Sequence, residues 1–163
     1  MVSPKSSHTV SAENRLQDLG IVLPNTPQPL GAYVEAVQSG NLLFLSGTLP
    51  IKDGKPQYVG RLGKELDADA GRDALRTATL NALSVAKEYL GSLDRVSKVV
   101  RAGVYLATSG DFYNQPIVAD AASELLRDVF GEDKMSVRSV FGVASLPLGV
   151  PVILEVTFEV ENK

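Results

Sequence analysis

The chain has 163 residues, of which 44% are hydrophobic and 21% charged, a composition typical of one soluble globular domain. The absence of cysteine excludes disulfides and cysteine-based metal sites, and the balance of 16 basic against 19 acidic residues, without a basic cluster, argues against an extended nucleic-acid surface. The start of the chain lacks an apolar signal segment and no apolar run approaches the roughly 18 residues of a membrane span, so we expect a cytoplasmic protein with neither membrane nor nucleic-acid partners.

Residues 1–29 are expected to form an N-terminal extension. The first nine residues are polar, contain the only histidine, His8, and are expected to fray. Ser11 is expected to cap a short helix that runs to Leu19 and ends at Gly20. Three prolines within residues 23–31 exclude regular structure there. One folded domain, residues 30–163, is expected to follow.

The first strands of that domain are expected at residues 32–37 and 42–47, joined by a turn at residues 39–41. The second strand is nearly all apolar, more than one covering helix layer requires, so we expect a subunit contact on its other face. Residues 49–63 are rich in glycine and proline and predict an irregular segment with a short strand near residues 57–59.

Two helices and a strand are expected in the middle of the chain. Helical periodicity runs over residues 67–90 and ends at Gly91, a strand is expected over residues 96–106, and a second helix follows from Asn114 and Pro116 to Gly131. The first helix has an apolar stripe rich in alanine, which predicts close packing on a sheet. The stripe consists of Ala70, Ala74, Leu75, Ala78, Ala82, Val85, Ala86 and Tyr89.

Two further strands are expected near the C-terminus. Residues 137–144 form a short apolar run, a Leu-Pro-Leu-Gly turn follows, and strict alternation from Val152 onward indicates a half-buried strand. The order of elements predicts an α+β fold, in which both helices cover one face of a mixed sheet of five or six strands.

Arg138, at the start of the strand at residues 137–144, is the main candidate for ligand binding. A guanidinium beside an apolar strand suits two-point binding of a carboxylate or phosphate, although pairing with a surface acid is the alternative. The folded part has no histidine for a metal site or a catalytic triad, and no phosphate-binding glycine motif, so no cofactor and no metal are expected.

Three motifs resemble one known family. Arg138-Ser139 is followed eight residues later by Leu146-Pro147 and the alternating strand, and the other motifs are GAYVEAV at residues 31–37 with GNLLFLSG at 40–47, and LGSLDRV at 90–96. The chain thus resembles the RidA/YjgF family of reactive-intermediate imine/enamine deaminases, whose older label is endoribonuclease L-PSP. The N-terminal extension resembles that of a longer branch of the family.

The resemblance implies a chorismate-mutase-like fold and a homotrimer with active sites between subunits. It implies that Arg138 holds the carboxylate of a 2-imino or 2-enamino acid and that Tyr33 and Ser46 line the pocket, while Asp120 and Val140 stand where the family has an asparagine and a cysteine. Water would then add to the imine carbon and ammonia would leave. Without the resemblance, Tyr33 is equally well a half-buried strand residue and Ser46 a turn residue.

The chain departs from the family at the glutamate that orients water. Counting from Leu146-Pro147, that position is Ile153, and the next acid on the same face is Glu155. Since isoleucine cannot orient water, two functions compete: an imine/enamine deaminase, or a catalytically weak binder or sensor of small carboxylates. Ribonuclease activity is disfavoured by the charge and by the lack of histidines.

Overall fold

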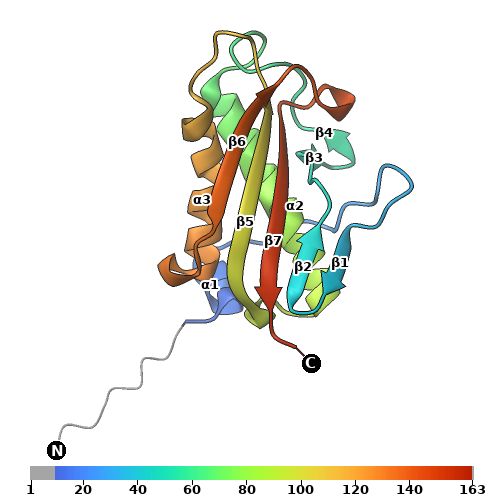
Figure 1. Ribbon diagram of the computed structural model, residues 1–163, viewed down its shortest axis with the longest axis vertical. Helices are drawn as coiled ribbons and strands as arrows, with labels where there is room; N and C mark the ends of the chain where they lie inside the picture. The colour runs from blue at the N-terminus through green and yellow to red at the C-terminus, as the bar shows by residue number, and fades with distance from the viewer. Residues whose placement is uncertain (1–9, 163) are drawn as a thin grey trace, which may run out of the picture.

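A five-stranded mixed sheet forms the centre of the computed structural model, which describes residues 10–162 (Figure 1). The strands lie in the order β1-β2-β7-β5-β6, and every pair is antiparallel except β5 with β6. A parallel pair needs a crossover connection, and α3 supplies it between β5 and β6. The strands are β1 Ala36–Ser39, β2 Leu42–Leu45, β5 Val96–Ala107, β6 Val137–Val143 and β7 Val152–Val160.

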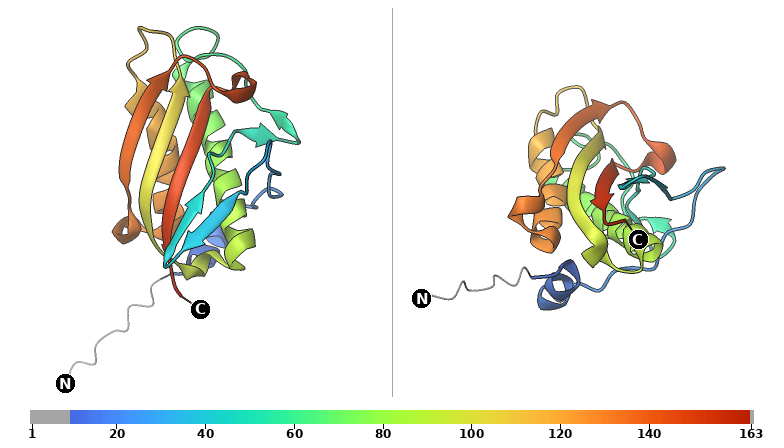
Figure 2. Two further views of the ribbon diagram at one scale, coloured as in Figure 1. Left: turned by 45° about the vertical axis from the view of Figure 1, so that its right-hand side comes forward. Right: turned by 60° about the horizontal axis from the view of Figure 1, so that its bottom comes forward.

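Two long helices, α2 (Ala68–Leu90) and α3 (Gln115–Phe130), cover the same face of the sheet (Figure 2). The Asp67 side chain accepts a hydrogen bond from the Ala70 amide at the start of α2, and Gly91 ends it with a φ of 83°. The expected α+β arrangement is therefore confirmed. Within the described residues, no helix is both long and apolar enough to cross a membrane.

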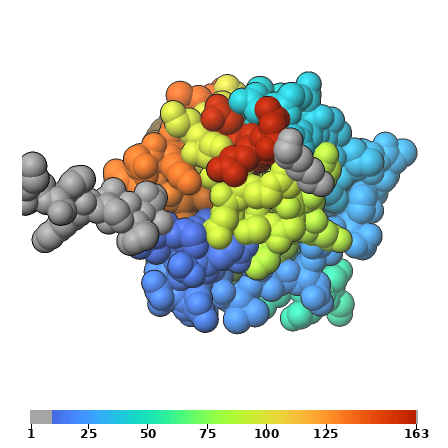
Figure 3. Space-filling model, turned by 90° about the horizontal axis from the view of Figure 1, so that it is seen from below, coloured from blue at the N-terminus to red at the C-terminus, as the bar shows by residue number. Residues whose placement is uncertain are grey.

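The N-terminal extension packs on this layer through a short helix, α1 (Ala12–Asp18). Its first turn is capped by the Ser11 side chain, as expected, and Ala12 and Leu16 belong to the hydrophobic core. Seen from below, the blue N-terminal segment lies against the yellow-green end of α2 (Figure 3). His8 and the expected fraying of residues 1–9 lie outside the described residues.

The core lies between the sheet and the two long helices. The alternation of β7 decides which side chains enter it. Buried residues point toward the helices, and the intervening ones do not. Alanines on α2 allow its backbone to approach the sheet closely, because a methyl group fills little space. The buried residues of β7 are Val152, Leu154, Val156, Phe158 and Val160, and the buried alanines of α2 are Ala74, Ala78, Ala82 and Ala86.

Some expected boundaries were wrong. The strand expected at residues 32–37 begins only at Ala36 and continues through Ser39, because the Tyr33 amide and hydroxyl bond within residues 30–33 and close a local turn. The strand expected near residues 57–59 is replaced by a hairpin of β3 (Ile51–Lys52) and β4 (Lys55–Pro56). Asp53-Gly54, both with positive φ, form its tight turn. Tyr89, placed on the buried stripe of α2, is 48% exposed.

Within residues 10–162, no helix covers the other face of the sheet, which we call the open face (Figure 2). Exposed apolar side chains lie on it. Val37, Phe44, Val137 and Phe141 are 43% to 67% exposed. The strand register places Val37, Phe44 and Val137 in one row with Thr157 and Arg101. Phe44 accounts for the excess hydrophobicity of the β2 sequence, since Leu43 and Leu45 alone enter the core.

The remaining helical segments are single turns. They are η1 (Leu93–Arg95), η2 (Glu132–Lys134) and η3 (Pro147–Gly149). The last of these is the expected Leu-Pro-Leu-Gly turn, and it brings β7 back along β5 after β6.

Candidate functional site

Arg138, Val140, Asp120 and Ser123 form one half of the candidate site, which we call the arginine edge. Arg138 lies on edge strand β6 opposite the buried Ala102, so its side chain is on the helix side of the sheet. Its Nη1 donates to Asp120 Oδ1 at 2.8 Å and to Ser123 Oγ at 3.1 Å, both on α3. Val140 follows two residues later on the same face and packs against the core.

Part of the Arg138 guanidinium has no partner among the described residues, although the residue is ion-paired. Its side chain is 26% exposed, and its Nε and Nη2 make no hydrogen bond with any residue from 10 to 162. These N–H groups lie in one plane with Nη1, so they suit the two oxygens of a carboxylate. Asp120 holds the fork in place and partly offsets its charge. The alternative, pairing with a surface acid, is therefore confirmed, and ligand binding by the remaining N–H groups stays a prediction.

Tyr33, Ser46, Gly47, Ile153 and Glu155 form the other half, the serine edge. Ser46 donates from its amide to the Glu35 carbonyl at 2.9 Å and from Oγ to the Val34 carbonyl at 2.6 Å. The Tyr33 hydroxyl accepts from the Leu30 amide at 3.0 Å, and its ring is 43% exposed. Both hydroxyls thus shape the backbone around β1 and β2.

Ile153 and Glu155 share the open face of β7, as the alternation predicts. Ile153 lies opposite Tyr105, and the exposed Glu155 lies opposite Gly103. Within the serine edge, Ile153 lies close to Gly47. A Cβ added to Gly47 would come within 2.9 Å of Ile153 Cγ2. The position at which the family resemblance predicts a glutamate is therefore filled by a branched apolar side chain against the Gly47 backbone.

A single chain does not bring the two halves together. Between β6 and β2 lie β5 and β7, a separation of about 14 Å at the usual spacing between strands. Arg138 also lies on the helix side, whereas Ile153 and Glu155 lie on the open side. A small acid held by Arg138 cannot reach the serine edge of the same chain.

A cavity of about 760 Å³ adjoins the serine edge. It lies between the proline-rich connector, the β2–β3 loop and α2, and Tyr33, Glu35, Gly47 and Asn81 are among its lining residues. Burial raises the pKa of the Glu35 carboxyl. Glu35 and Asn81 were not predicted from the sequence, since no local pattern marks the walls of a cavity built from distant segments. Ser123 was not predicted either, although its spacing of three residues from Asp120 on a helix indicates that the two side chains are neighbours.

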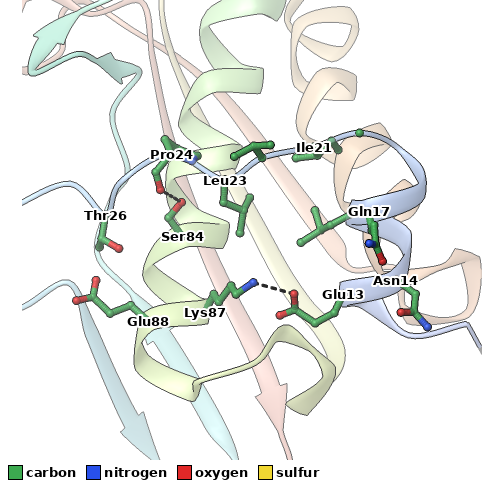
Figure 4. A pocket seen from close by; sticks show the side chains of 13 residues that line it. Glu13, Asn14, Gln17, Ile21, Leu23, Pro24, Thr26, Ser84, Lys87 and Glu88 are labelled. Atoms are coloured by element: carbon green, nitrogen blue, oxygen red, sulfur yellow. Dashed lines mark hydrogen bonds and ion pairs between the residues drawn. The ribbon is translucent and has the colours of Figure 1, made fainter.

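A second, more open groove of about 790 Å³ lies between α1, the connector and α2 (Figure 4). Lys87 Nζ donates to Glu13 Oε2 at 2.8 Å across it, and Ser84 Oγ donates to the Pro24 carbonyl at 2.8 Å. Burial raises the pKa of Glu13, but the hydrogen bonds from Lys87 and the Leu93 amide outweigh it and leave the pKa below its usual value. These contacts attach the extension to α2.

No metal site is apparent in residues 10–162. They contain no group of three or more histidine, cysteine, aspartate or glutamate side chains that could hold an ion. The two edges present a guanidinium fork, hydroxyl groups and carboxylates.

Known proteins resemble this chain over most of its length. The family model described as "YjgF/chorismate mutase-like, putative endoribonuclease" matches residues 13–159. Protein TCP17 of Trypanosoma cruzi is 40% identical to this chain, over a match that covers 90% of this chain and 92% of that protein. A 2-iminobutanoate/2-iminopropanoate deaminase of Dermatophagoides farinae is 30% identical over 83% of this chain and 91% of its own.

A solved structure shows the same fold. The protein Atu1372 of Agrobacterium tumefaciens, described as having unknown function, superposes with a TM-score of 0.84 at 32% identity, covering 92% of each chain. The sequence motifs, the mixed sheet under two helices and the match over residues 13–159 agree. The chain therefore belongs to the RidA/YjgF family, with its chorismate-mutase-like fold.

Proposed function

We propose that this protein hydrolyses reactive 2-imino and 2-enamino acids to 2-oxo acids and ammonia. The observation that carries the proposal is Arg138, whose Nη1 is held by Asp120 and Ser123 while Nε and Nη2 remain available for a substrate carboxylate. The deaminase name of a relative 30% identical to this chain supports the same reaction.

The hydrolysis depends more on how the substrate and a water molecule are positioned than on a strong acid or base catalyst. Water adds through its oxygen to the carbon of the C=N bond and gives a carbinolamine. The C–N bond then breaks, ammonia leaves with a proton from that water, and the C=O bond of the 2-oxo acid forms. Holding the carboxylate at Arg138 fixes the carbon relative to a bound water, which lowers the entropic part of the barrier.

Glu155 is the carboxylate on the open face of β7 that we propose to orient the water. It lies two residues beyond Ile153 on the same face, and the Gly103 position opposite it has no side chain to crowd it. A carboxylate within hydrogen-bond reach accepts a proton from water as the new C–O bond forms.

We propose that the complete site is shared between copies of the chain in a homotrimer. Arg138 lies on β6, at one end of the strand order, and Ser46 follows β2, near the other end. Neighbouring copies can join one edge to the other, and their contact would cover the apolar side chains of the open face. Sedimentation at micromolar concentration tests this assembly, and a monomer would contradict it.

The activity test is release of ammonia or 2-oxo acid from imines generated in situ by an amino-acid oxidase. The natural protein should accelerate release, and Arg138→Ala should not. Arg138→Ala and Tyr33→Ala, each inactive alone, should recover part of the activity when co-expressed, because mixed trimers contain sites with both edges intact. Lack of recovery would place the whole site within one chain.

The alternative is a weak binder or sensor of small carboxylates, and Ile153 favours it. Its side chain lies against Gly47 where a water-orienting acid is expected from the family resemblance. Binding of 2-oxo acids that depends on Arg138, without acceleration of imine hydrolysis, would select this alternative.

A further inference from the structure

The cavity beside the serine edge has the dimensions and lining of a ligand site. Its volume of about 760 Å³ falls within the range of about 300 to 1,000 Å³ that is usual for small-molecule pockets. Apolar side chains from three separate segments contribute to its wall, among them Leu30 of the connector, Leu49 of the β2–β3 loop and Leu80 of α2. Such a wall accommodates an apolar ligand body.

Two buried polar side chains of this cavity, Asn81 and Thr48, have an acceptor oxygen available. Asn81 is 2% exposed, and its Nδ2 donates to the Leu49 and Ile51 carbonyls at 3.0 and 2.9 Å. This geometry fixes the amide orientation, and Asn81 Oδ1 accepts no bond from residues 10–162. Thr48, 4% exposed, donates its hydroxyl hydrogen to the Ser46 carbonyl, so its oxygen can only accept another bond.

Glu35 adds a negative charge to these acceptors. It lines the cavity and forms neither a salt bridge nor a side-chain hydrogen bond with any described residue. A partly buried carboxylate without a partner is costly, and a cation that binds beside it would offset that cost. Lys52 and Asp53 also line the cavity, and both are exposed, so their opposite charges offset each other and Glu35 leaves the lining with a net negative charge.

We propose that this cavity binds a small organic cation with an apolar body and one ammonium group. The apolar body lies along the leucine-lined wall, and the ammonium donates to Glu35 and to Asn81 Oδ1. A neutral ligand of the same shape would leave the carboxylate unpaired, and an anion would be repelled by it. The cavity shares Tyr33 and Gly47 with the serine edge, but the inference does not rest on the deaminase proposal, because Glu35, Asn81 and Thr77 have no role in that proposal.

Calorimetric titration with 2-phenylethylammonium, 2-phenylethanol and 3-phenylpropanoate tests the proposal. The ammonium ion should bind about tenfold more tightly than the alcohol, since a charge-assisted bond replaces a neutral one, and the anion should not bind. Glu35→Gln should remove the preference for the ammonium ion. Glu88→Gln, an exposed acid on the same helix as Asn81, is the matched control and should leave the preference unchanged.

A variant that fills the cavity distinguishes binding inside it from binding to other acidic surfaces of the protein. Thr77 lines the cavity on α2 and is only partly buried, so Thr77→Phe should fill the space without disturbing the core and abolish binding of both the amine and the alcohol. Equal affinities for amine and alcohol would overturn the proposal. So would a preference that survives Glu35→Gln, binding that survives Thr77→Phe, or no binding to the natural protein.

Discussion

The arginine edge and the serine edge are built in different ways. At the arginine edge, side chains hold a side chain, since Asp120 and Ser123 on α3 position the fork of Arg138. At the serine edge, side chains hold the backbone, since the Ser46 and Tyr33 hydroxyls bond to main-chain groups. Substitutions at the first edge should therefore alter binding with little effect on folding, and substitutions at the second should alter the shape of the site.

The largest effect should come from Arg138→Lys. We expect binding of 2-oxo acids to weaken by about 100-fold, because breaking a charged contact costs about 2 to 5 kcal/mol and an ammonium cannot reproduce a two-point contact. Calorimetric titration measures it, and Arg76→Lys, at an exposed position of α2, is the control. Unchanged affinity in Arg138→Lys would mean that the residue contributes only its charge.

Ile153→Glu should raise the rate of imine hydrolysis by adding a second acid to the serine edge, at the position that the family resemblance gives to the water-orienting glutamate. A well-placed general base contributes about 10²- to 10⁴-fold. A new carboxylate is rarely within the required 0.5 Å or so, and we therefore expect about tenfold. The oxidase-coupled assay measures the rate.

Two control variants show whether a gain in rate comes from the new carboxylate acting on a substrate held by Arg138. Ile153→Gln has a side chain of similar size without a base, and the gain should be absent there and in an Arg138→Ala background. If the natural protein already matches a relative with the glutamate, and Ile153→Glu is no faster, an acid at position 153 is not needed, because Glu155 already orients the water as we propose.

Gly47→Ala should lower the stability of the serine edge. Its methyl group would come within 2.9 Å of Ile153 Cγ2, and such overpacking typically costs about 1 to 3 kcal/mol. Urea unfolding measures the loss. In an Ile153→Ala background, the same glycine substitution should cost much less, because the opposing methyl group is gone. Additive effects of the two substitutions would show that Gly47 matters for a reason other than this contact.

The smallest effect should come from Glu13→Gln, which lies away from both edges. Its bonds to Lys87 and the Leu93 amide should make the loss about 1 kcal/mol at pH 7, less than for buried charged pairs because the side chain is partly exposed. The folded state lowers the pKa of Glu13, so its contribution is complete above the ordinary value of 4.5 and is lost as the pH falls through the folded-state pKa.

Urea unfolding at pH 7 and near pH 3 checks whether the contribution of Glu13 to stability is lost at low pH. The difference in stability between Glu13→Gln and the natural protein should shrink at the lower pH. A constant difference would indicate that packing of the side chain, and not its charge, holds the extension to α2.

Local sequence patterns predicted the elements that bury a periodic stripe. The alternation from Val152 and the alanine stripe before Gly91 correspond to β7 and α2, because each periodicity reflects one face in contact with the core. The same patterns failed where local bonds compete with strand pairing, as at Tyr33, and where the chain carries no periodic stripe, as in the β3–β4 hairpin. Arg138 was found because it begins an apolar run and matches a family motif.

The sequence by itself determined the α+β class, the family and the residue at the centre of the arginine edge, since each depends on neighbouring residues or on a motif. Only the tertiary structure decided that Arg138 bonds with Asp120 and Ser123, and that Ser46 lies three strands away from Arg138. It also decided that Glu35 and Asn81 share a cavity. The physical reason is that strand order and helix packing bring together segments far apart in the chain, and these contacts leave no periodic trace within any one segment.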